Sequence, residues 1–263
     1  MNIRPVLLVL TAITVFSCTK SENESGSDSS SSVNNAVFSV SDTHKVRFAP
    51  SNLLYKDGNY SFALYQYNYG DYFGWGTGNN PSLTSTNETY YQDFYDWGYY
   101  IEGGYRTLTV EEWEYLLYYR DHSLEKIATG SVNGTHGLII LPDNWTLPEG
   151  SSFLSGYPTT DDNVWSHNEY NIAQWQKMES AGAVFLAAAG HRFNTSIYEV
   201  GGNGTYWTSS LRTDNEMHTE NAIYIFFTGC DISWGVHYAY SDDPNSYDRS
   251  CGRSVRLVQD VAD

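Results

Sequence analysis

The sequence predicts an α+β fold in which two helices pack on a mainly antiparallel, loop-rich sheet. Two patterns indicate this class: capped helical segments occur between residues 109 and 182, and the C-terminal third consists of strand segments separated by turns. Helices followed by a run of strands are typical of an α+β architecture. No linker, low-complexity break or internal repeat interrupts residues 36–263, so the sequence predicts one domain there, long enough to bury a sizeable core.

Short strands and a long loop region are expected before the first helix. KVRFA (45–49) and SFALY (61–65) have strand composition, and Asp57-Gly58 between them marks a turn. Residues 66–104 are rich in Tyr, Gly and Asn without periodicity. We expect this region to be an ordered loop, because a flexible one would not carry so many large side chains.

Two helices are predicted from capping boxes. Thr109 with Glu112 starts the first, and Trp113 and Leu116 follow on one face. The second is expected from near Ser166, with Glu169 three residues later completing its capping box, to about residue 182.

The remaining segments are predicted strands. GLIILP (137–142) and AVFLAAAG (183–190) are apolar and short, as buried strands are. The C-terminal strands are TYWTSS (205–210), AIYIFF (222–227), DISWGVHYAY (231–240), which alternates strictly, and SVRLV (254–258). A tight turn at 228–230 is expected to join the second and third of these as a hairpin.

The glycine-rich stretch GGNG at 201–204 does not predict a phosphate site. A nucleotide loop requires Gly-Lys-Ser/Thr or spaced glycines opening a helix, whereas these glycines precede a strand and no lysine is near. We expect them to form a tight turn with positive φ angles and to lead into a strand whose Trp207 packs in the core.

Composition narrows the class of partner. The formal net charge of −17 argues against nucleic acid and against electrostatic docking on an anionic membrane. Aromatic residues make up 16 % of the chain, with 23 Tyr and 8 Trp. Such a composition suits a β-rich core and surfaces that stack on the apolar faces of sugars.

The N-terminus predicts export and a lipid anchor. Residues 1–17 contain Arg4 and an apolar run too short for a membrane span of ~20 residues, as in a secretory signal peptide. VFSC resembles the lipobox of bacterial lipoproteins, in which Cys18 would be lipidated, although Phe16 departs from the usual small residue. Residues 18–35 are rich in Ser, Asn and acidic residues and predict a disordered linker. The expected location is the outer membrane, with the external face favoured and the periplasmic face the alternative.

Cys230 and Cys251 remain after lipidation and predict a disulfide. An exported protein occupies a compartment that permits disulfides, and an even pair fits one bridge. The alternative is two buried thiols.

Four segments of the sequence resemble those of known proteins. RTLTVEEWEYLL (106–117) is similar to the R-L-P-T-x-x-E-W-E segment of the formylglycine-generating-enzyme fold, a variant of the C-type lectin fold. The segments GAVFLAAAGHR, GGNGTYWTSS and CGRSVRLVQD resemble three successive landmarks of the FISUMP (major paralogous domain) family of bacterial surface lipoproteins. The resemblance covers roughly residues 106–260 and implies a C-type-lectin-like domain.

The resemblance does not imply catalysis. Formylglycine enzymes hold copper with a closely spaced cysteine pair, whereas Cys230 and Cys251 are 21 positions apart and match no such motif. No metal-binding His motif or nucleophile elbow is present, and His191 is interpreted as a structural hydrogen-bonding residue. Carboxylate pairs for glycoside hydrolysis remain an open alternative, because 31 acidic residues offer many combinations.

The sequence does not predict a calcium site. The segment 241–248 offers oxygen ligands, but the Trp-Asn-Asp partner of calcium-dependent lectins is missing, so the segment is interpreted as a solvated turn. No cofactor is expected.

The predicted function is therefore non-catalytic binding of an extracellular glycan or a surface or host protein. The alternatives are an adhesive or structural subunit of a surface assembly, and an enzyme on the same scaffold. Three loop segments combine aromatic rings with Asp or Asn side chains, the pairing that a sugar requires. The candidate ligand-binding residues are Asp161, Asp162, Asn163, Trp165, Trp234, Tyr238, Asp242, Asp243, Asn245 and Tyr247.

Overall fold

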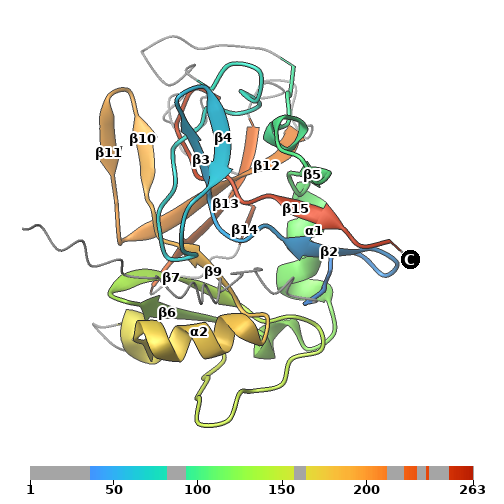
Figure 1. Cartoon of the computed structure of the whole chain (residues 1–263), viewed down its shortest axis with the longest axis vertical. Helices are drawn as coiled ribbons and strands as arrows, with labels where there is room; N and C mark the ends of the chain where they lie inside the picture. The colour runs from blue at the N-terminus through green and yellow to red at the C-terminus, as the bar shows by residue number, and fades with distance from the viewer. Residues whose placement is uncertain are drawn as a thin grey trace, which may run out of the picture. The chain divides into compact units, whose positions relative to one another are not determined.

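The computed structural model describes residues 36–81, 93–156, 164–211, 222–229, 235–236 and 249–262 (Figure 1). This part of the chain is a mixture of short helices and several small sheets, which confirms the α+β class. The strands are β1 (Phe38–Ser39), β2 (Lys45–Phe48), β3 (Leu53–Lys56), β4 (Asn59–Phe62), β5 (Tyr105–Arg106), β6 (Ile127–Val132), β7 (Thr135–Ile140), β8 (Glu169–Tyr170), β9 (Val184–Ala187), β10 (His191–Phe193), β11 (Ser196–Tyr198), β12 (Asn203–Leu211), β13 (Ala222–Thr228), β14 (Gly235–Val236) and β15 (Val258–Asp260). The α-helices are α1 (Val110–Glu114) and α2 (Ile172–Ser180).

The strands form separate sheets rather than one. The four-stranded sheets have the orders β1-β2-β15-β5 and β8-β6-β7-β9, and β12-β13-β14 form a third sheet. Two hairpins, β3-β4 and β10-β11, stand as two-stranded ribbons. All of these pairings are antiparallel except that of β6 with β8.

The sheet β8-β6-β7-β9 is buried on both faces. Alternate residues such as Ile139 and Phe185 pack with Trp175 and Met178 of α2, which lies along one face of the sheet (Figure 1). The residues between them, for example Leu138, belong to the cluster that contains Trp113 of α1. This double burial is why the segments 137–142 and 183–190 are apolar without alternation, and both predicted strands are confirmed.

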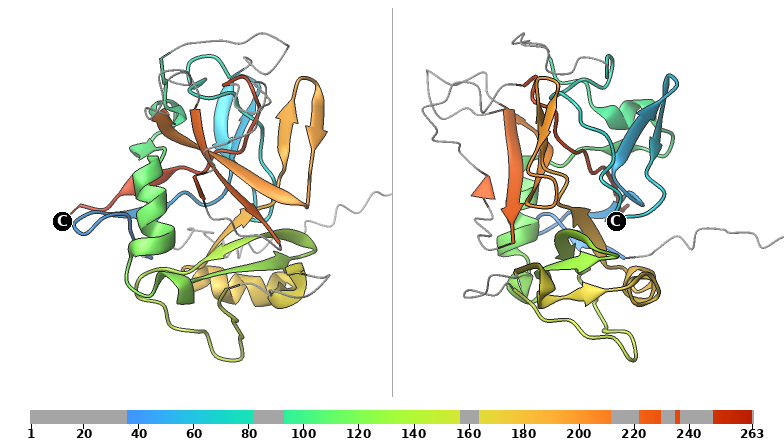
Figure 2. Two further views of the ribbon diagram at one scale, coloured as in Figure 1. Left: turned by 180° about the vertical axis from the view of Figure 1, so that it is seen from behind. Right: turned by 90° about the vertical axis from the view of Figure 1, so that its left-hand side faces the viewer.

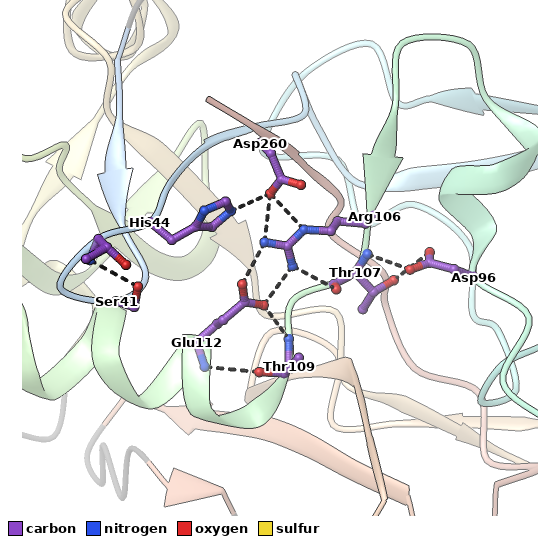
Figure 3. Close-up of polar contacts among 9 residues, drawn as sticks. Ser41, His44, Asp96, Arg106, Thr107, Thr109, Glu112 and Asp260 are labelled. Atoms are coloured by element: carbon purple, nitrogen blue, oxygen red, sulfur yellow. Dashed lines mark hydrogen bonds and ion pairs between the residues drawn. The ribbon is translucent and has the colours of Figure 1, made fainter. Parts of the chain in front are cut away.

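The start of α1 follows the predicted capping box. Thr109 Oγ1 accepts a hydrogen bond from Glu112 N at 3.2 Å, and the Glu112 carboxylate accepts one from Thr109 N at 2.8 Å (Figure 3). The helix continues as a single π-helical turn, Tyr115–Tyr119. Figure 3 also shows Arg106 between Glu112 and Asp260, so the helix start is connected to β15.

The second helix begins later than predicted. Its N-cap is Asn171, whose side chain accepts a hydrogen bond from Gln174 N in a complete capping box. The residues expected to start it instead form a 3₁₀ turn, Val164–His167, followed by β8. Pairing of β8 with β6 keeps the chain extended there, and this contact is not local in sequence.

The aromatic loop region forms part of the core. Phe73, Trp75 and Trp97 are each buried, and they pack with Trp207 in a second cluster. The described parts of residues 66–104 contain one 3₁₀ turn, Trp97–Tyr100. The prediction of an ordered, aromatic-rich loop is thus confirmed for those parts.

Several strand predictions need correction. The segment 45–49 contains β2 as expected, but β4 starts two residues before SFALY, and β3 was missed because its residues lie beside the Asp57-Gly58 turn. That turn is confirmed, with φ of 52° at Asp57 and 83° at Gly58. β13 pairs with β14, and in this pairing Phe226 lies opposite Gly235. Eight residues, 227–234, therefore connect the two paired positions. The predicted tight turn at 228–230 is too short for this register and is wrong.

Two of the glycines at 201–204 are required for different structural reasons. Gly201 has φ of 77°, as predicted for a tight turn. Gly202 and Gly204 do not have positive φ angles, so the prediction is wrong for them; at Gly204 a Cβ would overlap the ring of Phe227. Trp207 is 1 % exposed in the core, as expected.

Residues 1–35 lie outside the described part, so the signal peptide, the linker and the domain start at residue 36 stay predictions. Among the helices of the described residues, none combines the length and the apolar character needed to cross a bilayer.

Candidate functional site

Most of the predicted binding residues fall outside the described part of the chain. This holds for Asp161, Asp162, Asn163, Trp234, Tyr238, Asp242, Asp243, Asn245 and Tyr247, and also for Cys18 and Cys230. The candidate calcium ligands in the segment 241–248 lie outside it too.

Trp165 is the one predicted ligand-binding residue that the structure describes, and it lies in the core. Its side chain is 8 % exposed and packs in the same cluster as Trp113. The ring of His136 stacks on it with centroids 5.0 Å apart and planes at 12°. His136 Nδ1 is itself 2.8 Å from Gly201 O, so a ring fixed to the backbone covers the face that a ligand would need.

A cavity of about 380 Å³ lies between the β10-β11 hairpin and the sheet that contains β12 and β13. Figures 1 and 2 show the hairpin standing beside that sheet. The described residues that line the cavity are His191, Phe193, Tyr198, Glu199, Asn203, Thr205, Tyr224, Phe226, Cys251 and Arg253. They come from segments far apart in the sequence, which the fold brings together.

Strand register explains which residues face the cavity. Thr205 pairs with Phe226, and Trp207 pairs with Tyr224, so these residues share one face of the β12-β13 pair. The residues between them, such as Tyr206 and Phe227, belong to the first core cluster on the opposite face. One face therefore packs on the first core cluster, while the other contributes Trp207 to the second cluster and also forms the cavity wall.

The hairpin is held to the body of the domain at Arg192. Its backbone exchanges two hydrogen bonds of 2.8 Å with Gly252, and its Nη2 donates to Tyr72 O at 3.0 Å. The hairpin turn places Asn194 at φ of 52°, a conformation that Asn tolerates. The opposite wall of the cavity is thus fixed by backbone contacts rather than by side-chain packing alone.

Aromatic rings form much of the wall. His191 and Tyr198 face each other across the hairpin, with centroids 5.8 Å apart and planes at 26°. The guanidinium of Arg253 lies 3.4 Å from the ring centroid of Tyr224 and 5.0 Å from that of Trp207. This contact between a cation and two rings keeps Arg253 at 3 % exposure while it still borders the cavity.

The cavity has one exposed polar side chain at its rim and one buried polar side chain in its wall. Glu199 is exposed at the rim, and its φ of 58° is unusual for a residue with a side chain. Asn203 is 7 % exposed, and its buried Oδ1 accepts no hydrogen bond. An unsatisfied buried acceptor costs about 1–3 kcal/mol.

His191 is neutral at neutral pH. Burial lowers the pKa of its imidazole, the nearby positive charge of Arg253 lowers it further, and Glu199 opposes the shift in part. A neutral imidazole has one donor and one acceptor nitrogen. The structure places His191 at the cavity wall, stacked on Tyr198, and its predicted role as a structural hydrogen-bonding residue stays a prediction.

Within the described ranges, no group of three or more His, Cys, Asp or Glu side chains is arranged to hold a metal ion. Glu199 is the only carboxylate among the described lining residues of the cavity.

A larger cavity, of about 960 Å³, is bordered by Trp75, Asp93, Glu111, Leu211 and Arg249 among others. The guanidinium of Arg249 stacks on Trp75, 4.9 Å from a ring centroid. Residues 82–92 and 212–221 join this wall directly at Asp93 and Leu211 and lie outside the described part. The smaller cavity is therefore the better-defined candidate site.

Comparison of the chain with protein-family models, with curated proteins and with solved structures gave no match.

Sequence reasoning missed the smaller cavity. The stretch HRFNTSIY at 191–198 carried a usable signal, because Asn194-Thr195 separates two short segments that pair as a hairpin. What the sequence did not show is that this hairpin lies against β12 and β13.

Proposed function

We propose that the chain is a lipid-anchored cell-envelope protein whose C-type-lectin-like domain binds an extracellular glycan or protein without chemistry. The signal-like N-terminus, Cys18 and the polar linker support the anchor. The residue segments that resemble the FISUMP family support the lectin-like fold. The outer surface of the outer membrane is the proposed location, with the lipid as the link to the membrane.

The single observation that carries the binding proposal is the cavity between the β10-β11 hairpin and β12-β13. It combines aromatic rings with a carboxylate, an amide and a neutral imidazole. Binding pockets for small molecules are mostly apolar, with a few placed polar groups that fix orientation. Aromatic faces with hydrogen-bonding groups beside them match the two kinds of surface that a sugar presents.

The same cavity supports binding over glycoside hydrolysis. Glycosidases that use the usual mechanism place two carboxyl groups on either side of the bond they cleave. The described lining residues supply Glu199 alone.

One observation favours the enzyme alternative. His191 and Cys251 border the same cavity, and a histidine beside a thiol is a common way to activate a nucleophile. A disulfide between Cys230 and Cys251 would remove that thiol. A disulfide at Cys251 would therefore exclude a thiol enzyme, whereas a free thiol there would leave both the binding protein and the enzyme open.

The test uses the full chain, purified from cell envelopes in detergent. Intact mass should show an acyl-modified chain that begins at Cys18, and a Cys18→Ala variant should lose both the added mass and the membrane fraction. An unmodified cytosolic chain would contradict the anchor.

Ligand binding is tested separately with the same preparation on a glycan array and in a binding assay with host and envelope proteins. Binding to glycans should be retained without added calcium. Capture of envelope proteins without any glycan signal would favour the adhesive subunit. Turnover abolished by a single Asp, Glu or Cys substitution would establish the enzyme.

A further inference from the structure

We infer that the cavity recognises one uncharged sugar ring, with Glu199 as the main acceptor for its hydroxyl groups and the Tyr198–His191 pair as its stacking wall. This inference rests on the proposed function, since it names the ligand class of the binding site described above.

The size of the cavity favours a small ligand or one unit of a larger one. At about 380 Å³ it lies near the lower end of ligand pockets, which span about 300–1,000 Å³. A terminal sugar unit of a glycan fits this volume, whereas the flat, wide contact of a folded protein does not need a cavity.

The accessible charge of the site is negative. Glu199 is exposed at the rim, whereas Arg253 is 3 % exposed beneath the ring of Tyr224. An approaching ligand therefore meets the carboxylate before it meets the guanidinium. The net charge of −17 adds a repulsive field for anions around the whole chain. An uncharged sugar is consequently preferred over an acidic sugar of the same shape.

Glu199 is held in place by the turn in which it lies. Its carbonyl oxygen accepts hydrogen bonds from Gly202 N at 2.9 Å and Asn203 N at 3.1 Å. Its backbone is in the left-handed region, a conformation that persists where surrounding contacts enforce it. An ionised carboxylate has two acceptor oxygens, and neighbouring hydroxyls of a sugar supply two donors. Because the turn is already formed, the backbone needs no further ordering on binding, and only the Glu199 side chain has to be ordered.

The inner end of the cavity offers a second polar contact. Asn203 Oδ1 accepts no hydrogen bond, and rotation of the amide group exchanges its acceptor and donor ends. Asn203 borders the cavity and is 7 % exposed, but Oδ1 has almost no exposed surface, so a ligand contacts this oxygen only if the side chain rotates toward the cavity. A sugar hydroxyl, which both donates and accepts, satisfies either orientation.

The stacking wall follows from the hairpin. Tyr198 is 48 % exposed although it is a large ring, and it stacks on His191, which is neutral. A neutral imidazole and a phenol ring present an apolar face to the C–H side of a sugar. Protonation of His191 would place a cation in that face.

The test compares methyl glycosides of neutral hexoses and N-acetylhexosamines with methyl glycosides of hexuronic acids, using the full chain and isothermal titration. At least one neutral glycoside should bind, and the hexuronic acid of matching stereochemistry should bind at least tenfold more weakly. Glu199→Gln should weaken the neutral sugar about tenfold and reduce the discrimination against the acid. Tyr198→Ala should weaken both sugars.

The matched control is Ile197→Ala, because Ile197 is 51 % exposed on the same hairpin and does not line the cavity. Its affinities should equal those of the unaltered chain, and thermal unfolding should show all three variants folded. Equal affinity for neutral and acidic sugars, or an unchanged affinity in Glu199→Gln, would overturn this inference while leaving glycan binding in place. Absence of binding to every glycoside, together with binding to envelope or host proteins, would overturn the glycan part of the proposed function itself.

Discussion

Arg106 and Glu112 form a two-point ion pair, with Nη1 of Arg106 2.7 Å from Oε2 of Glu112 and Nη2 2.6 Å from Oε1. The same carboxylate accepts the hydrogen bond from Thr109 N that completes the capping box of α1. Arg106 Nε in turn donates to Asp260 at 2.8 Å. One glutamate thus connects the start of a helix to two strands of the sheet β1-β2-β15-β5.

Glu112→Ala should lower the free energy of unfolding by about 2 kcal/mol, because it removes both the ion pair and half of the capping box. Glu112→Gln should cost about 1 kcal/mol, because the amide oxygen can still accept from Thr109 N. Urea unfolding of the two variants measures the difference. Glu102→Gln is the control, since Glu102 is exposed, and it should change stability by less than about 0.5 kcal/mol. Equal losses for Gln and Ala would show that the ion pair carries the whole effect.

Arg120 and Asp143 form a second, more deeply buried pair. The Arg120 side chain is 1 % exposed, its Nη1 lies 3.3 Å from Asp143 Oδ1, and burial lowers its pKa to about 10. Asp143→Asn should destabilise the domain by about 3–5 kcal/mol, because it leaves a buried cation without its counter-ion.

The double variant Arg120→Met/Asp143→Asn should recover part of that loss, since no charge then remains buried. Lys45→Gln is the matched control: Lys45 contacts the same carboxylate at 3.7 Å but is 51 % exposed, so its loss should stay below about 1 kcal/mol. A double variant as unstable as Asp143→Asn would contradict the explanation that the unpaired charge of Arg120 destabilises the single variant.

Acid sensitivity should come partly from Asp143. Burial favours the neutral carboxyl group, but hydrogen bonds from Ser39 and the charge of Arg120 outweigh burial and lower its pKa below 3.8. A carboxyl group with a lowered pKa in the folded state stabilises the fold above its unfolded pKa, and that stability is lost as the pH falls through the folded pKa. Unfolding free energy should therefore decrease as the pH is lowered below about 5. Asp143→Asn should show a shallower decrease over the same range; identical slopes would exclude the contribution.

Gly204→Ala should destabilise the domain by about 1–3 kcal/mol, because its Cβ would overlap the ring of Phe227. Gly202→Ala is the control, since its Cβ would lie 3.0 Å from a carboxylate oxygen of Glu199 and 3.3 Å from the Glu199 backbone oxygen without overlapping a ring, and it should cost less than Gly204→Ala. Phe227→Leu should partly rescue Gly204→Ala in the same thermal unfolding assay. A lack of rescue would contradict close packing as the reason for this glycine.

The Cys230–Cys251 disulfide remains a prediction, because Cys230 lies outside the described residues and Cys251 is described as buried, at 2 % exposure. Intact mass of the native chain should increase by the mass of two hydrogen atoms on reduction, and reduction should lower stability by about 3 kcal/mol for a loop of about 20 residues. Two thiols that react with an alkylating reagent in the unfolded, unreduced chain would refute the bridge.

Local signals in the sequence predicted local structure. The Thr109–Glu112 box was found because both residues act within one helical turn. Ser166–Glu169 has the same pattern and was wrong, because pairing of β8 with β6 decides where the next helix begins, and Asn171–Gln174 then caps it. The strand β6 was missed because Gly130 and Thr129 interrupt its apolar pattern.

The candidate site was the part least accessible to prediction. Its walls come from the hairpin at 191–198, from β12 and β13, and from residues 251–253. None of these segments has a binding motif on its own, and their contact depends on the register of β12 with β13 and on the backbone bonds between Arg192 and Gly252. Trp165 shows the opposite error. Its position beside Asp and Asn residues suggested a ligand site, but its side chain packs in the core.

The position of β15 between β2 and β5 bears on the order in which the chain folds. Gln259 pairs with both Arg47 and Tyr105, so this sheet cannot close until nearly the whole chain has emerged. Until β15 is available, the early strands remain without their central neighbour, so this sheet forms late in folding. Removal of the tail by a protease would reopen the same sheet and expose two strand edges for degradation.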